Sequence, residues 1–122
     1  MKLRRYGFFR ELDHGDSDGE SLSELSGTAH YDEATKKRVV EYLASGHLVV
    51  GCPGTVVDVL AEGDPTPIGS PDILTDGEWA WPGDLPYYVL HYRVPVPQEM
   101  LDTMKKHSWH VPQQIEVTEL EL

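Results

Sequence analysis

Apolar positions repeat with helical spacing in the segment 32–45 of this chain. The periodicity predicts one helix with a single apolar face there. Acidic side chains at its start support this prediction, because they interact favourably with the positive end of the helix dipole. The predicted element is Asp32–Ser45, with Val39, Val40 and Leu43 on the apolar face, Tyr42 beside them and Gly46 as the C-cap.

Two further helices follow in the second half of the chain. The first is Asp84–Tyr92, whose apolar residues fall at i, i+3, i+4 and i+7, with Asp84 as the N-cap. The second begins at Pro97 and runs to about His107, because proline is tolerated at a helix start. Met100, Leu101 and Met104 form its apolar face.

Short β-prone runs predict the strands. The strongest local signal is Asp76-Gly77 between two such runs, which predicts a tight hairpin that aims Trp79 and Trp81 at one face. The other expected elements are a strand at Leu3–Arg10, a hairpin of His47–Cys52 with Thr55–Leu60 around Cys52–Gly54, loops at Glu11–His30 and Ala61–Pro71, one helical turn at Leu22–Leu25, and an edge strand or frayed tail at Gln113–Leu122.

These elements predict an α+β fold, a small antiparallel sheet with about three helices packed on one face. A chain of 122 residues forms one domain, 1–122. No apolar run approaches a membrane span, and Tyr6–Phe9 is too short for a signal peptide core. Cys52, the single cysteine, excludes an internal disulfide and favours a cytoplasmic location.

The charge is strongly negative and uneven, with a net value of −11. Residues 1–10 hold four bases and no acid, whereas residues 11–35 hold eight acids and no lysine or arginine. This balance argues against nucleic-acid binding, which needs a basic surface. Two interpretations stay open: an acidic soluble protein whose charge has no role in binding, or a protein whose charge attracts a basic partner.

No residue pattern predicts a metal, a cofactor or a catalytic centre. The acidic stretch Asp13–Glu20 departs from the register of a calcium loop, and the six histidines lack a zinc-site spacing. They are expected at the surface or at helix caps. Cys52 as a nucleophile, with His47 or His91 as its base, rests on residue types alone.

Aromatic residues are the other candidates for function. Aromatic side chains fill small cores and also dominate interface hot spots, so both roles are open. The residues concerned are Trp79, Trp81, Tyr87, Tyr88 and Trp109.

The segment TDGEWAWPGDLPYYVLHYRVPVPQEML resembles a group of uncharacterised small actinobacterial proteins, many of which also begin with a stretch like Tyr6–Glu11. The resemblance spans most of the chain and supplies no catalytic residues. Similar W-P-x-x-L-x-Y-Y motifs occur in small acidic proteins encoded beside bacterial toxins. The resemblance therefore implies an immunity-type role.

The leading hypothesis is a non-enzymatic acidic binding protein that neutralises a basic protein partner such as a toxin. The alternatives are a regulatory or housekeeping interaction domain and a small hydrolase without a recognisable motif. The sequence leaves the oligomeric state open. The residues expected to contact the partner are Asp13, Asp16, Asp18, Glu20, Trp79, Trp81, Tyr87 and Trp109.

Overall fold

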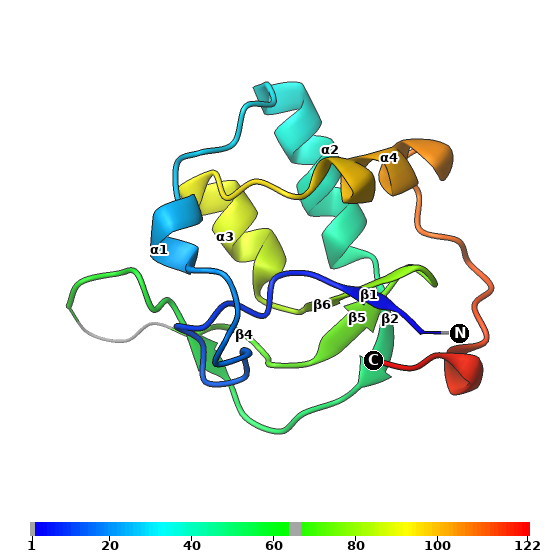
Figure 1. The fold of residues 1–122 in the computed structure, drawn as a ribbon, viewed down its shortest axis with the longest axis horizontal. Coiled ribbons are helices and arrows are strands. Elements are labelled where there is room, and N and C mark those ends of the chain that lie inside the picture. The colour runs from blue at the N-terminus through cyan, green and yellow to red at the C-terminus, as the bar shows by residue number, and fades with distance from the viewer. Residues whose placement is uncertain (1, 64–66) are drawn as a thin grey trace.

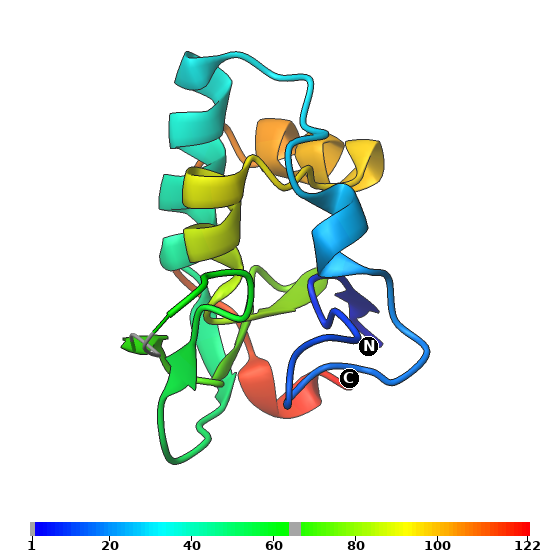
Figure 2. The ribbon, with the colours of Figure 1, turned by 90° about the vertical axis from the view of Figure 1, so that its left-hand side faces the viewer.

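The structure is a computed structural model that describes residues 2–63 and 67–122. Its fold is α+β, and Figures 1 and 2 show the α-helices gathered on one side of the larger sheet. That sheet has four strands. The described elements are β1 (Arg4–Arg5), α1 (Leu22–Leu25), α2 (Glu33–Ala44), β2 (His47–Val50), β3 (Val56–Val57), β4 (Pro67–Gly69), β5 (Ile73–Thr75), β6 (Trp79–Pro82), α3 (Leu85–Tyr92), α4 (Gln98–Lys106) and a 3-10 helix (Val117–Glu119).

The four-stranded sheet has the order β1-β6-β5-β2, and β3 pairs with β4 in a separate two-stranded sheet. The pairing of β1 with β6 is parallel, so the sheet is mixed and not wholly antiparallel as expected. The hairpin predicted around Cys52–Gly54 is wrong, because β2 pairs with β5 and β3 with β4. The carboxylate of Asp72 accepts the backbone N–H of Cys52 at 2.7 Å, which ties the end of β2 to β5.

Two other strand predictions need correction. The strand expected at Leu3–Arg10 lasts only two residues, because Gly7 has φ of +94° and turns the chain out of the sheet. Phe8 and Phe9, which follow, lie in irregular backbone and are buried in the core. The predicted loop Ala61–Pro71 contains β4, while residues 64–66 of that loop lie outside the described residues.

The helices of the sequence prediction are confirmed. In α2 the Asp32 side chain accepts the N–H of Thr35 at 2.8 Å, and Val39 and Leu43 are fully buried. The C-cap is Ser45 and not Gly46. A Cβ at Gly46 would lie 2.7 Å from the Trp81 ring, so glycine is needed there for close packing. The tail forms the 3-10 helix and a bridge between Lys2 and Glu121.

The hairpin of β5 and β6 anchors the helix layer to the sheet. Thr75 pairs with Ala80, so the turn is centred on Gly77 and Glu78, one residue later than expected. The indole N–H of Trp79 donates to Thr103 in α4 at 3.1 Å, and that of Trp81 donates to the Leu43 carbonyl in α2 at 3.0 Å. Both indoles therefore point to one face, as predicted.

Within residues 2–63 and 67–122, no helix combines the length and the apolar character that a membrane crossing requires.

Candidate functional site

The acidic loop, Asp13–Glu20, is folded tightly onto the core segment that precedes it. The N–H of Asp16 donates to the Phe8 carbonyl at 3.0 Å, and the N–H of Arg10 donates to the Glu20 carbonyl at 3.1 Å. Leu12, at the entrance of the loop, is 6% exposed. The sequence predicts a loop here, and the structure shows in addition that hydrogen bonds tie its backbone to the core segment.

Two glycines make this close approach possible. A Cβ at Gly15 would lie 1.8 Å from the Phe9 carbonyl oxygen, and a Cβ at Gly19 would lie 2.5 Å from that of Phe8. Any larger residue would force the loop away from the core, because real Cβ atoms do not approach backbone oxygens so closely. The loop is therefore held by steric fit as well as by hydrogen bonds.

The carboxylates of the acidic loop point mostly to solvent. Asp16 pairs with Arg5 at 3.1 Å, and both side chains are more than a third exposed. Among the described residues, Asp13, Asp18 and Glu20 are exposed and their carboxylates make no ion pair or hydrogen bond. Three free negative groups therefore sit on one fixed loop.

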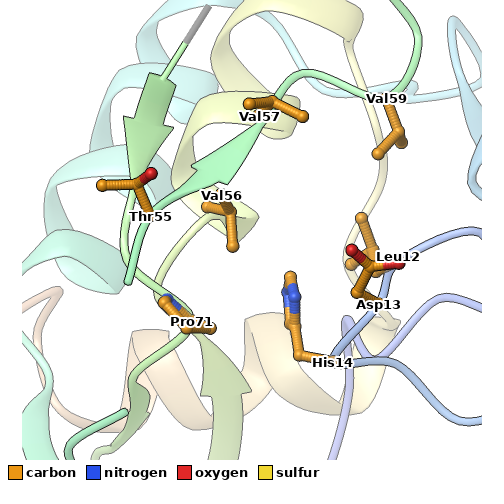
Figure 3. Close-up of a pocket in the computed structure, with 8 residues that line it drawn as sticks. All are labelled: Leu12, Asp13, His14, Thr55, Val56, Val57, Val59 and Pro71. Carbon is orange, nitrogen blue, oxygen red and sulfur yellow. The ribbon is translucent and has the colours of Figure 1, made fainter. Parts of the chain in front are cut away.

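A pocket of about 270 Å³ lies between the start of the acidic loop and the segment around β3. Figure 3 shows its lining side chains facing one another across the opening, with the His14 ring directed into the space between Val56 and Leu12. Most of the wall is apolar, and none of the described lining residues is a lysine or arginine. The lining residues are Leu12, Asp13, His14, Thr55, Val56, Val57, Val59 and Pro71.

His14 is backed by a buried carboxylate. Its Nε2 lies 3.0 Å from Oδ2 of Asp84, whose side chain is fully buried. Asp84 is the N-cap residue of α3, as predicted, but its side chain makes no capping hydrogen bond. The positive end of α3 favours a charge at this place. His14 itself is 16% exposed at the side chain, not a freely solvated surface histidine.

Nε2 of His14 and both carboxylate oxygens of Asp84 are buried, and none of them has a hydrogen-bond partner among the described residues. When Nε2–H faces Asp84, the neutral ring presents Nδ1 as a hydrogen-bond acceptor. A hydrogen bond from Nε2–H to Asp84 would orient His14 for general-base chemistry. The sequence analysis missed this pair, because the two residues are 70 positions apart and follow no spacing rule.

Asp58 fixes the β3 wall of the pocket to α3. Its Oδ2 accepts the hydroxyls of Tyr87 at 2.7 Å and Tyr92 at 2.6 Å. Burial raises the pKa of Asp58, but the hydrogen bonds from Tyr92 and Tyr87 outweigh it and hold that pKa below its usual value. The bond to Asp58, with desolvation, raises the pKa of Tyr92 to about 12. Tyr87, expected at a partner interface, thus has a structural contact.

The expected aromatic residues do not form one surface. Trp79 and Trp81 are 3% and 0% exposed, so both belong to the core and neither is a surface contact. Trp109 is half-buried and follows α4, and Figures 1 and 2 place the segment after α4 away from the acidic loop.

Trp109 lies at a different part of the surface from the acidic loop. Its φ is +63° and that of Ser108 is +55°, a conformation that costs about 1–2 kcal/mol for a residue with a Cβ. The Arg38 guanidinium carbon lies 5.6 Å from the ring centre. Trp109 also borders a hollow of about 400 Å³ together with Tyr31 and Lys105.

The other candidate chemistry is dispersed. Cys52 is a free, half-buried thiol. His47 binds the Pro112 carbonyl at 2.7 Å, and the His91 ring lies 4.5 Å from the Tyr87 ring. Among the described residues, no group of three or more His, Cys, Asp and Glu is placed to hold a metal ion.

No family model, no curated protein and no solved structure matches this chain. Its function is therefore inferred from the chemistry of its own surfaces.

Proposed function

We propose that this chain is a non-enzymatic binding protein that docks a basic protein partner against the acidic loop, in the manner of an immunity protein. The observation that carries the proposal is the fixed loop with three carboxylates that have no partner in the part of the chain that the structure describes, those of Asp13, Asp18 and Glu20. A binding surface that is already ordered loses little conformational entropy when the partner arrives.

The basic N-terminal segment does not cancel this acidic surface. Arg4 pairs with Glu99, and Arg10 lies 4.0 Å from Glu24, so each of these arginines faces an acid outside the loop. Among the described arginines of this segment, Arg5 alone pairs with a carboxylate of the loop, that of Asp16. The remaining carboxylates are free to attract a cationic surface and to accelerate the encounter.

The net charge of −11 supports the same class of partner. It disfavours nucleic acid, whose phosphates need a basic surface. The resemblance to small actinobacterial proteins and to acidic proteins encoded beside toxins agrees with an immunity-type role in the cytoplasm. A regulatory interaction domain with a basic partner would use the loop in the same way, and the partner's identity separates the two.

The test is the dependence of association rate on ionic strength. Wild type is compared with a variant that carries Asp13→Asn, Asp16→Asn, Asp18→Asn and Glu20→Gln. The partner is the product of a neighbouring reading frame or a protein recovered by affinity capture. The quadruple variant should associate at least about tenfold more slowly at low salt, with a flatter salt dependence.

A matched control changes the net charge equally at four other exposed acids. These are Glu41, Glu62, Glu116 and Glu121, each replaced by Gln. The control should keep most of the wild-type rate. Equal losses in both variants would show that net charge alone matters, and an unchanged rate in the quadruple variant would refute docking at the acidic loop.

One observation favours a second function, a small hydrolase. His14 lies at a pocket with its Nε2 3.0 Å from the buried Asp84 carboxylate, and a histidine beside a carboxylate is a candidate general base. In that case, hydrolysis of small ester or amide substrates would disappear in a His14→Gln variant whose fold is intact. Absence of any wild-type turnover across such substrates would remove this alternative.

A further inference from the structure

We propose that the pocket beside the acidic loop receives one lysine or arginine side chain of the partner. This inference rests on the proposed function and adds the site at which the docked partner is anchored. The ligand of the pocket is then a side chain with an aliphatic stem and a cationic end.

The size of the pocket fits a side chain better than a free metabolite. Its volume is about 270 Å³, below the roughly 300–1,000 Å³ of typical small-molecule sites. The wall is formed by Leu12, Val56, Val57, Val59 and Pro71. Lysine and arginine bury their methylene stems along such apolar surfaces and keep the charged end at a polar site.

The polar groups of the pocket match a cation. Asp13 contributes a carboxylate without an intramolecular partner among the described residues. Nε2 of His14 lies 3.0 Å from the buried Asp84 carboxylate, and a neutral ring with its proton on Nε2 offers Nδ1 as a hydrogen-bond acceptor. Because the described lining contains no lysine or arginine, an anionic group would meet the Asp13 carboxylate without a basic side chain to offset the repulsion.

The β3 wall is fixed before any ligand arrives. The hydroxyl of Tyr88 accepts the N–H of Val59 at 3.1 Å and donates to the Val57 carbonyl at 3.2 Å. Asp58 accepts the next two backbone N–H groups, of Leu60 at 2.9 Å and Ala61 at 3.0 Å. An ordered wall of this kind favours binding of a single side chain, because little ordering remains to be done.

The test uses capped tripeptides Gly-X-Gly as probes, where X is arginine, lysine, norleucine or glutamate. Binding is followed by NMR through the methyl signals of Val56, Val57 and Val59 and the ring signals of His14. The arginine and lysine peptides should bind at least about tenfold more tightly than the norleucine peptide, and the glutamate peptide should bind least.

The matched variants are Asp13→Asn and Asp18→Asn. Both remove one exposed charge from the same loop, but only Asp13 lines the pocket. Asp13→Asn should remove most of the preference for cationic peptides, and Asp18→Asn should leave it nearly unchanged. Neither carboxylate has a described partner, so both variants should fold.

Three results would overturn the proposal: equal affinity for the norleucine peptide, equal effects of the two variants, or signal changes that lie outside the pocket. The proposed function is judged separately by the association kinetics of the quadruple variant. If that variant loses salt-dependent association while the tripeptides show no cation preference, the loop attracts the partner but the pocket does not anchor it.

Discussion

The β5–β6 hairpin and the acidic loop are both built around aspartate and glycine, yet they use their carboxylates in opposite ways. In the hairpin, Asp76 is 2% exposed and accepts the N–H groups of Glu78 at 2.9 Å and Trp79 at 2.7 Å. It also accepts the Tyr42 hydroxyl at 2.6 Å. In the loop, the carboxylates of Asp13 and Asp18 have no partner among the described residues.

The difference shows that a net charge of −11 has two components. Part of the acid belongs to the fold, where carboxylates accept backbone N–H groups and tyrosine hydroxyls. Burial, then the hydrogen bond to Asp76, raises the pKa of Tyr42 well above its usual value. Other carboxylates, such as those of Asp13 and Asp18, are exposed without a partner among the described residues and are available to a binding protein. Composition counts both components alike, and only the contacts of each carboxylate separate them.

The largest expected effect tests the structural component. Asp76→Ala should lower the free energy of unfolding by about 3 kcal/mol or more, because it leaves the buried Trp79 N–H without an acceptor and removes the acceptor that Asp76 offers to the Tyr42 hydroxyl. Urea denaturation measures the change. Asp76→Asn keeps one acceptor oxygen and should cost less. If Asp76→Ala is no more damaging than Asp18→Ala, the comparison fails.

The second effect concerns the hairpin turn. Gly77→Val should cost roughly 1–3 kcal/mol, because φ of +97° strains a β-branched residue even though the space near Ile115 is adequate. The control is Gly51→Ala, where φ is not positive and a Cβ has ordinary contacts. Thermal melting compares the two. An unchanged melting temperature for Gly77→Val would contradict the observed turn.

A third prediction concerns Glu11, which precedes the acidic loop and belongs to the structural component. Its carboxylate accepts the N–H groups of Leu22 and Ser23, both at 2.8 Å, at the start of α1. Burial raises the pKa of Glu11, but these hydrogen bonds outweigh it and lower the pKa to about 2 from the usual 4.5.

A carboxyl group with a lowered pKa stabilises the fold above its unfolded pKa and loses that contribution as the pH falls toward the folded value. Wild type should therefore lose stability between about pH 4.5 and pH 2. Glu11→Gln should be less stable by about 1 kcal/mol at pH 7 and show a flatter acid profile. Denaturation across this range, with Glu24→Gln as control, measures it. Parallel profiles would argue against the capping role.

The smallest effect tests the exposed component. Replacement of Asp13, Asp16, Asp18 and Glu20 by their amides should change stability by no more than about 0.5 kcal/mol, since exposed charges contribute little. Chemical denaturation beside wild type measures it. A loss of several kcal/mol would mean that the acidic loop is structural, and the contrast with the hairpin would disappear.

Local sequence signals predict the parts of this fold that local interactions decide. The cap at Asp32, the apolar face of α2 and the Asp76-Gly77 region follow from rules that apply within a few residues. The orientation of the Trp79 and Trp81 side chains toward one face follows from the alternation of side chains along a strand. The acidic loop was also located correctly, because its composition marks it as neither helix nor strand.

Long-range pairing lay beyond these signals. The Cys52–Gly54 region favours a local hairpin, but β2 reaches Leu74 and Thr75 instead, because burial across the whole sheet outweighs one turn. The candidate pocket shows the same limit. His14 and Asp84 come into contact because the acidic loop folds back against the start of α3. Their spacing in the sequence does not predict this contact.

Gly15 and Gly19 have a practical consequence for protein engineering. Because their hydrogen atoms face the Phe9 and Phe8 carbonyls, the backbone of the acidic loop tolerates no side chain at either position. Positions 13, 17, 18 and 20 are exposed and free to vary. A combinatorial library that randomises these four and keeps both glycines should yield folded variants with new partner preferences on an unchanged scaffold.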